Sequence, residues 1–167
     1  SDVSGISGEA KFVEEKVNST RKKKVFIVHG HNDALKQEAA RIIEKQGIEA
    51  VILSEQANQG KTIIEKIEEN ADVDAICLFT GDDYGRAKGT EAEENKLRAR
   101  QNVVFEAGYF MGKLGRKNVI IVADKNLELP SDMQGVVYTD AGNWKTEVLQ
   151  GLDKIGYAID FNKLFRR

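Results

Sequence analysis

The hydrophobic residues of this chain fall into short continuous runs, separated by stretches in which apolar side chains recur every three or four residues. The helical period is clearest at 35–43, at 63–67, at 100–115 and from about Trp144 onward. Continuous apolar runs that alternate with helices are typical of parallel strands buried on both faces. We therefore predict an open, flavodoxin-like three-layer α/β fold with five parallel strands in the order 2-1-3-4-5. The predicted strands are 25–28 (VFIV), 50–53 (AVIL), 75–79 (AICLF), 119–122 (VIIV) and 135–138 (GVVY).

The first 23 residues differ from the rest because they are polar and carry few apolar positions. Such composition is typical of a linker. The chain also opens with Ser1 rather than Met, so we expect residues 1–23 to be a linker from an upstream domain. Residues 24–167 are predicted to form one domain.

Composition limits the classes of partner and compartment. The 167 residues are 41% hydrophobic, and 25 basic against 27 acidic residues give a net charge of -2, so nothing in the overall charge calls for nucleic acid. One cysteine cannot form an internal disulfide, and no apolar run reaches the roughly 18 residues that a membrane span needs. We expect a cytoplasmic protein that binds neither nucleic acid nor membrane.

Two loops are the best candidates for a binding site. In a sheet of this order, ligands bind beyond the carboxyl ends of the strands, where the strand order reverses. That point lies between the strands at 25–28 and 75–79, which are followed by HGHND (29–33) and TGDDYG (80–85). For Asp82 and Asp83, turn formation is an equally open interpretation. The candidate ligand-lining residues of the two loops are His29, Gly30, His31, Thr80, Asp82 and Asp83.

The predicted helix RQNVVFEAGYFMGKLG (100–115) carries a carboxylate in apolar surroundings. At about 100° per residue, Glu106 falls on a narrow polar stripe beside a broad apolar face. It could be a surface residue paired with Lys113 or an arginine, or a functional carboxylate at the predicted site. Gly108 and Gly112 cost a helix about 1 kcal/mol each relative to Ala, which predicts close packing against a neighbour.

Several familiar motifs fail on their spacing or residues. NQGKT (58–62) ends like a P-loop, but residue 55 is Glu where the first glycine should stand, so Thr62 is better read as a helix cap. No GxGxxG follows the first strand, and a phosphoacceptor receiver would need acidic residues that are absent here. Cys77 lies inside a predicted strand and reads as a buried, inert thiol. His29 and His31 lack a third ligand, so no metal is expected.

Four ordered segments together resemble bacterial TIR-like domains, the effectors of cyclic-nucleotide-signalled antiphage defence. The resemblance runs from about Lys24 to Asp160 and is carried by VFIVHGHND, NQGKTIIEKIEENADVDAICLFTGDDYG, RARQNVVFEAGYFMGKLGR and LPSDMQGVVY. It implies a TIR fold in which NQGKT belongs to the BB loop. It also implies hydrolysis of NAD+ to nicotinamide and ADP-ribose or its cyclic form, triggered by assembly with other TIR copies. A cyclic nucleotide would be sensed by a domain outside this chain.

The resemblance places the catalytic glutamate on Glu106, which we expect to act ionised at its ordinary pKa. NAD+ is then the substrate, and no cofactor is expected. We further expect Phe79 and Tyr84 to offer aromatic faces to the substrate. Arg100 and Asn102 should bind hydroxyls or phosphates, although a salt bridge is an equal interpretation for Arg100.

Two other functions stay open at this point. The domain could be a non-enzymatic TIR interaction module, because fold alone does not establish activity. It could also be a nucleoside deoxyribosyltransferase-like enzyme, in which a glutamate acts as the covalent nucleophile.

Overall fold

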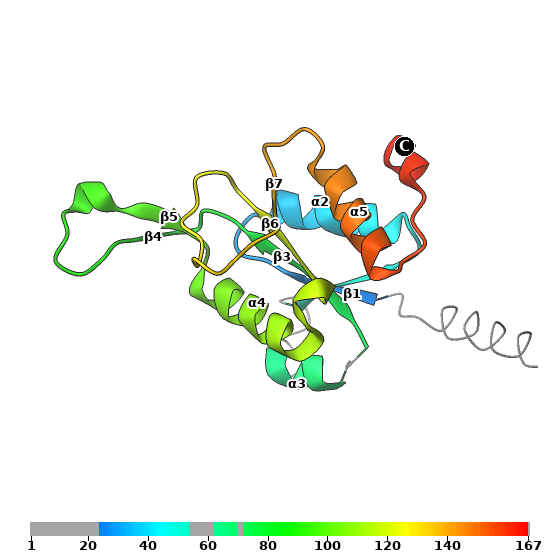
Figure 1. The fold of residues 1–167 in the computed structure, drawn as a ribbon, viewed down its shortest axis with the longest axis horizontal. Coiled ribbons are helices and arrows are strands. Elements are labelled where there is room, and N and C mark those ends of the chain that lie inside the picture. Colours follow the sequence, from blue (N-terminus) through cyan, green and yellow to red (C-terminus); the bar gives the residue numbers. More distant parts are fainter. Residues whose placement is uncertain (1–23, 54–61, 70–71, 167) are drawn as a thin grey trace, which may run out of the picture.

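A five-stranded parallel sheet forms the centre of the domain, as the computed structural model of residues 24–53, 62–69 and 72–166 shows (Figure 1). The strand order is β2-β1-β3-β6-β7, which confirms the predicted order, since β6 and β7 are the fourth and fifth predicted strands. The strands are β1 (Lys24–Val28), β2 (Glu49–Ile52), β3 (Asp74–Phe79), β6 (Val119–Ala123) and β7 (Val136–Tyr138).

The central strand is β3, which pairs with β1 on one side and with β6 on the other. All six of its residues are buried, as expected for a continuous apolar run covered on both faces. The register places Cys77 opposite Val28, the last residue of β1. The carboxyl ends of β1 and β3 therefore lie at the same edge of the sheet.

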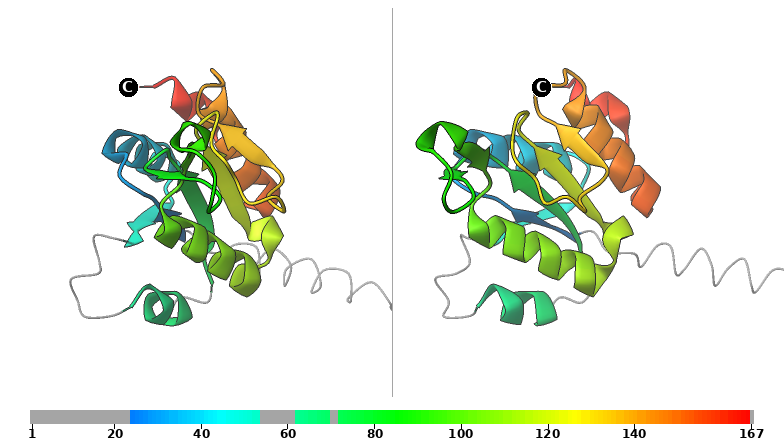
Figure 2. Two further views of the ribbon diagram at one scale, coloured as in Figure 1. Left: turned by 90° about the vertical axis from the view of Figure 1, so that its left-hand side faces the viewer. Right: turned by 60° about the vertical axis from the view of Figure 1, so that its left-hand side comes forward.

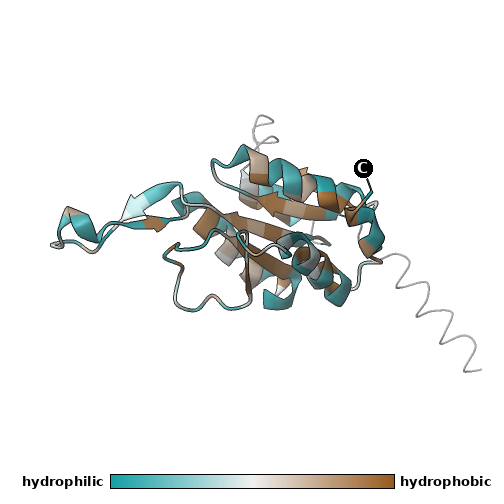
Figure 3. Cartoon of the chain, turned by 90° about the horizontal axis from the view of Figure 1, so that it is seen from above, coloured by the Kyte–Doolittle hydropathy of each residue, from teal (hydrophilic) through white to brown (hydrophobic). Residues whose placement is uncertain are grey.

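Among the described residues, two helices pack on each face of the sheet, and Figures 2 and 3 show helices on both sides of it. Helices α2 (Asp33–Glu44) and α5 (Trp144–Ile155) pack on the face formed by Val25, Ile27, Ile76 and Leu78. Helices α3 (Ile63–Glu69) and α4 (Gln101–Leu114) pack on the opposite face. Because alternate residues of a strand point to opposite faces, the side chains of each strand pack into two separate hydrophobic clusters, one on each side of the sheet.

Side-chain hydrogen bonds cap the starts of helices α2 and α3. The Asn32 side chain accepts a hydrogen bond from the N–H of Leu35 at 3.0 Å. At α3, Thr62 Oγ1 accepts from Glu65 N at 3.2 Å, and Glu65 Oε2 accepts from Thr62 N at 3.1 Å. This reciprocal capping box confirms the helix-cap interpretation of Thr62. The rest of NQGKT and the linker at 1–23 lie outside the described residues.

The glycines of α4 do not mark a close helix contact. Both Gly108 and Gly112 are exposed, and a Cβ added at either position would meet nothing within 4 Å among the described residues. The expectation of tight packing at these glycines is therefore wrong. The face of α4 that packs on the sheet carries Val103, Ala107 and Phe110 instead.

A projecting two-stranded ribbon follows β3 and was not predicted from the sequence (Figure 1). It pairs β4 (Asp83–Gly85) with β5 (Lys96–Arg98) in antiparallel register, and the 3-10 turn η2 (Ala92–Glu94) lies near its tip. At its base, Arg98 donates to Glu128 at 2.8 Å, and the N–H of Glu128 donates to the carbonyl of Leu97. The loop after β6 therefore holds the ribbon in place.

The C-terminal segment packs back on the amino-terminal end of the sheet. After α5, the hydroxyl of Tyr157 donates a hydrogen bond to the buried carboxylate of Asp74 at the start of β3. Two short 3-10 turns complete the described chain, η3 (Arg116–Asn118) and η4 (Phe161–Leu164). None of the described helices combines the length and apolar character that crossing a membrane requires.

Candidate active site

The loops that follow β1 and β3 touch each other through the side chain of Asp82. Its Oδ2 accepts a hydrogen bond from the backbone N–H of His31 at 3.2 Å, and its Oδ1 accepts from Thr80 Oγ1 at 2.9 Å. Thr80 itself is buried. The structure thus brings the two predicted loops together, with Asp82 as a structural tie between them.

Gly30 lies directly against this tie. A Cβ at position 30 would stand 1.8 Å from Asp82 Oδ2, so only glycine leaves room for the carboxylate. The neighbouring His29 is half-buried, and its Nδ1 donates to the carbonyl of Gly30 at 2.8 Å, while His31 is exposed. Within residues 24–53, 62–69 and 72–166, no cluster of three or more His, Cys, Asp or Glu residues could hold a metal ion.

Asp124 also lies at the edge of the sheet formed by the carboxyl ends of the strands, and it was not predicted from the sequence. It follows β6, and its carboxylate accepts from the N–H of Gly81 at 3.2 Å and from Thr139 Oγ1 at 3.0 Å. Two aspartates therefore connect the loops after β1, β3, β6 and β7. The signal was present in the sequence, because Asp124 directly follows a buried apolar run, as a ligand-edge residue would.

Glu106 lies in the second turn of α4 and is 8% exposed. Its negative charge acts on the thiol of Cys77, which places the carboxylate near the middle of β3. Because Cys77 is in register with the last residue of β1, Glu106 stands close to the point where the strand order reverses. The carboxylate is thus buried at the interface of α4 and the sheet rather than directed to bulk solvent.

Burial raises the pKa of Glu106 from its ordinary value to about 7, and the positive charge of Arg100 opposes this rise. The expectation of an ordinary pKa is therefore wrong, because burial of Glu106 disfavours the charged form of its carboxyl group. In the described part of the chain, no ion pair joins Glu106 to Lys113 or to an arginine. The carboxylate is held near the balance between its neutral and charged forms at neutral pH.

Arg100 and Asn102 flank the start of α4. Arg100 is the exposed residue that precedes the helix, and its positive charge acts on Glu106 although the two side chains form no ion pair in the described part of the chain. Asn102 is exposed in the first turn. Both side chains are therefore on the solvent side of the buried carboxylate.

Three other candidates lie in different surroundings. Phe79 is 0% exposed and packs in the core beneath α4, which leaves no aromatic face for a ligand, so the expectation for this residue is corrected. Tyr84 is 73% exposed and, with exposed Asp83, belongs to β4 of the projecting ribbon. The ribbon had not been predicted, and it carries these two residues away from the sheet (Figure 1).

Cys77 is a buried free thiol, as its place in a strand predicted. Its pKa is raised, first by burial and second by the negative charge of Glu106. A thiol in this state is almost entirely protonated at neutral pH and is a poor nucleophile. Chemistry at this site therefore depends on the carboxylate and not on the sulfur.

The five-stranded parallel sheet in the order β2-β1-β3-β6-β7 is consistent with a TIR-like α/β fold. Residues 24–143 match the family described as "CAP12/Pycsar effector protein, TIR domain". The chain belongs to this family of TIR domains, which confirms the resemblance drawn from its motifs.

Curated relatives share this domain. The chain is 49% identical over 147 residues to the uncharacterized protein YuaY of Escherichia coli, covering 84% of this chain and 48% of YuaY. It is 29% identical over 142 residues to CD-NTase-associated protein 12 of Niabella drilacis, covering 80% and 45% of the two chains. The Pycsar effector protein BcPycTIR of Burkholderia cepacia is 47% identical over 64 residues, which is 37% of this chain and 20% of that protein. The chain thus spans about half the length of the first two relatives.

Proposed function

We propose that this domain is an NAD+ glycohydrolase and that Glu106 is its catalytic residue. The observation that carries the proposal is a single buried carboxylate, with its pKa raised to about 7, beside the strand-order reversal of a TIR-family sheet. Ionisable groups with strongly shifted pKa values are frequent at functional sites. The family match supports the substrate class, and the buried acid supports the residue.

Cleavage of the bond between nicotinamide and ribose needs one negatively charged side chain and no general acid. When the bond between ribose C1′ and the nicotinamide nitrogen breaks, the electron pair stays on the nitrogen, and nicotinamide departs as a neutral molecule. No acid has to protonate it, in contrast to the leaving oxygen of ordinary glycosidases. The carboxylate of Glu106 stabilises the positive charge that develops on the ribose. Water then adds to C1′ and releases one proton, or an adenine nitrogen adds to give the cyclic product.

The raised pKa suits this role because it responds to the substrate. NAD+ carries a positive nicotinamide ring, and an opposite charge near a carboxylate lowers its pKa. Substrate binding therefore favours the ionised form of Glu106, which the empty protein disfavours by burial. The negative charge of Glu106 is then present, once substrate has bound, at the position where the ribosyl cation forms.

The residues around Glu106 have supporting roles in this proposal. His29, Gly30, His31 and Thr80 line the edge of the sheet, and Asp82 holds their loops together. Arg100 and Asn102, on the solvent side of Glu106, bind phosphates or hydroxyls of the substrate. Tyr84 and Asp83 contact the substrate only from the ribbon.

In its full-length protein, we infer that the domain is a cytoplasmic effector of antiphage defence. A cyclic nucleotide bound by a domain outside this chain would trigger assembly of TIR copies and so switch on cleavage of NAD+. The relatives named as a Pycsar effector and as a CD-NTase-associated protein support this context.

The test is chromatography of NAD+ after incubation with the domain at high protein concentration, and with the full-length protein plus candidate cyclic nucleotides. We expect free nicotinamide together with ADP-ribose or its cyclic form. Glu106→Gln and Glu106→Ala should abolish the release and leave the melting temperature at least as high. Glu44→Gln removes an exposed carboxylate from α2 and serves as the matched control with full activity.

The same assay separates the two alternative functions. Release of free base from deoxynucleosides would identify a deoxyribosyltransferase-like enzyme. No cleavage of either substrate by the activated full-length protein would favour an interaction module. Undiminished nicotinamide release by Glu106→Gln would remove Glu106 from the mechanism.

A further inference from the structure

A cavity lies between the loops that follow β6 and β7, at the edge of the sheet formed by the carboxyl ends of the strands. Its volume is about 570 Å³, and small-molecule sites in proteins usually measure roughly 300–1,000 Å³. The cavity therefore has the size of a binding site for a small molecule. Its lining residues are Lys125, Asn126, Leu127, Tyr138, Asp140 and Ala141.

This cavity lies on the face of the sheet that α4 covers. Val136 packs against the hydrophobic cluster beneath α4, whereas Val137 packs against the cluster on the other face. Because alternate residues of a strand point to opposite faces, the Tyr138 side chain lies on the same face as Val136. Leu127 packs against the cluster beneath α4 as well. The cavity and Glu106 are therefore on the same side of the sheet.

Leu127 also connects the cavity with the loop that follows β3. A Cβ at Gly81 would stand 3.4 Å from Leu127 Cδ2, so this side chain lies against the backbone between Thr80 and Asp82. One strand, β6, separates β3 from β7. Neighbouring strands are about 4.8 Å apart, which puts the end of β7 about 10 Å from the end of β3. A dinucleotide with its reacting ribose at Glu106 is long enough to cross β6 and enter the cavity.

Tyr138 gives the cavity an aromatic wall that is open to solvent. Its side chain is 44% exposed at the end of β7. The loop after β6 contributes three successive residues to the lining, where a φ of 68° at Asn126 turns the chain sharply. Asparagine tolerates this left-handed conformation better than most residues do. An exposed ring, the carboxamide of Asn126 and the apolar side chain of Leu127 thus meet at one cavity.

An exposed ion pair joins the two loops of the cavity. Lys125 Nζ lies 3.5 Å from Asp140 Oδ2, and both side chains are largely exposed. Such pairs contribute little to stability, because water and salt screen their charges. Lys125 can therefore exchange Asp140 for a phosphate oxygen at little cost, and it brings a positive charge to the rim of the cavity.

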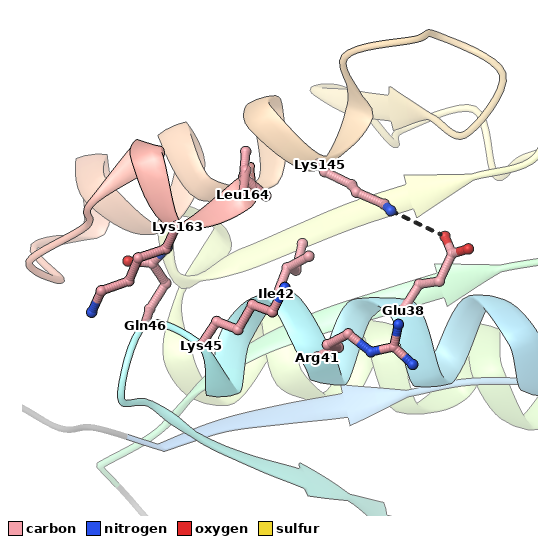
Figure 4. Close-up of a pocket in the computed structure, with 8 residues that line it drawn as sticks. All are labelled: Glu38, Arg41, Ile42, Lys45, Gln46, Lys145, Lys163 and Leu164. Atoms are coloured by element: carbon pink, nitrogen blue, oxygen red, sulfur yellow. Dashed lines mark ion pairs between the residues drawn. The ribbon is translucent and has the colours of Figure 1, made fainter. Parts of the chain in front are cut away.

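The cavity between α2, α5 and η4 has no comparable set of groups that converge on a ligand (Figure 4). Figure 4 shows the Lys163 ammonium directed away from the Arg41 guanidinium. Lys145 already pairs with Glu38 at 3.8 Å. Helices α2 and α5 also pack on the face of the sheet opposite to α4. The cavity beside β7 is therefore the better placed of the two for a ligand that reaches Glu106.

We propose that the cavity beside β7 binds the adenine base of an adenine nucleotide. That this nucleotide is NAD+ rests on the proposed glycohydrolase function. A purine stacks on an exposed aromatic ring such as that of Tyr138. The Asn126 carboxamide has both a donor and an acceptor, the pair that matches N7 and the N6 amino group of adenine. Recognition of this base favours NAD+ over nicotinamide mononucleotide, which has the same scissile bond but no adenine.

The test is a titration of the isotope-labelled Glu106→Gln domain, followed by amide chemical shifts, because this variant should bind NAD+ without cleaving it. Separate arms use AMP, ADP-ribose, NAD+ and nicotinamide mononucleotide. We expect saturable shifts at 125–127 and 138–141 with the three adenine compounds and none there with nicotinamide mononucleotide. Shifts at these positions that are equal for AMP and nicotinamide mononucleotide, or absent with all four compounds, would overturn the proposal.

Variants of Tyr138 decide whether the aromatic wall carries the binding. Tyr138→Ala should weaken ADP-ribose at least about fivefold because stacking is lost, whereas Tyr138→Phe keeps the ring and should stay within about twofold. Phe165→Ala removes another exposed ring and is the matched control with unchanged affinity. Equal affinity of Tyr138→Ala and Tyr138→Phe would contradict the proposal. So would loss of self-association in Tyr138→Ala without any shift on addition of AMP, since the ring would then contact a second copy.

Failure of the adenine site and failure of the proposed function give different results. Shifts at 125–127 and 138–141 with AMP, but no nicotinamide release by the activated full-length protein, support the adenine site and remove the glycohydrolase. Nicotinamide release with an unchanged KM for NAD+ in Tyr138→Ala removes the adenine site and keeps the glycohydrolase. If both hold, Tyr138→Ala should raise KM at least about fivefold with kcat nearly unchanged, because adenine lies away from the breaking bond.

Discussion

The carboxylate of Asp82 accepts a hydrogen bond from the backbone N–H of His31, 51 residues earlier in the chain. This bond joins the loops that follow β1 and β3, and it forms only because residue 30 has no side chain. The edge of the sheet on which the proposed substrate would lie is therefore held in shape by one aspartate and one glycine.

Gly30→Ala should damage this edge. The new Cβ would force the Asp82 carboxylate away from His31 and Thr80, because it would stand 1.8 Å from Oδ2. We expect a lower free energy of unfolding, measured with urea, together with loss of nicotinamide release. Gly108→Ala is the control, since its Cβ meets open space and should stabilise α4 by about 1 kcal/mol. Equal stability of the two variants would show that Asp82 does not need the space beside Gly30.

Activity should rise with pH through about 7. The proposed reaction uses ionised Glu106, and its pKa is raised to about 7 in the free protein. The profile of kcat/KM reports the free enzyme, and that of kcat reports the bound one. We expect the midpoint of the kcat profile at lower pH, because the positive nicotinamide ring favours the carboxylate. A flat profile of kcat/KM between pH 5 and 9 would contradict this assignment of the pKa.

The same carboxyl group should make stability depend on pH in a definite direction. Between its ordinary pKa and about 7, the folded state binds more protons at Glu106 than the unfolded state does. Its contribution to stability is therefore highest at acid pH and falls as pH rises through this window. Glu106→Gln should remove this decrease in stability with pH. The free energy of unfolding of the variant should therefore exceed that of the wild type by the largest amount above pH 7. Urea denaturation at a series of pH values measures the difference.

Arg100→Gln should raise the pKa of Glu106 further. The guanidinium is the charge that opposes the effect of burial, so its removal favours the protonated acid. The carboxyl carbon of isotope-labelled Glu106, titrated by NMR, should then ionise at higher pH than in the wild type. Lys113→Gln, an exposed change on the same helix, should leave the titration where it was. An unchanged midpoint in Arg100→Gln would mean that the two charges do not interact.

Tyr157→Phe should destabilise the domain by about 1–3 kcal/mol. The change removes the hydroxyl that donates to the buried carboxylate of Asp74, while the ring can still fill its place. Urea unfolding measures the cost, and Tyr109→Phe on α4 is the control, because the Tyr109 hydroxyl makes no hydrogen bond within the described part of the chain. A loss no larger than that of the control would show that Asp74 keeps its partners without Tyr157.

The strands and long helices follow from the sequence because each depends on a local pattern. The run AICLF predicts β3, and the spacing of apolar residues at 103, 107 and 110 predicts the buried face of α4. Strand order could also be predicted, since the crossover connections of parallel sheets limit the arrangements that are possible.

Features that depend on contacts between distant segments escaped prediction. The ribbon at 83–98 has no alternating apolar pattern, and Glu128 holds it from a loop about 30 residues later. The pKa of Glu106 depends on how deeply α4 packs on the sheet, which helical spacing alone does not reveal. Phe79 was assigned to a ligand from its place at a strand end, although the alternation of side chains sends it into the core.

The central place of β3 has a consequence for synthesis on the ribosome. This strand needs β1, which is made before it, and β6, which begins 40 residues after its last residue. Until β6 emerges, a nascent chain exposes an open edge of hydrophobic backbone, the kind of surface that promotes aggregation. Completion of the sheet must therefore wait until most of the domain has left the exit tunnel, and a chaperone that shields nascent chains would act during that interval.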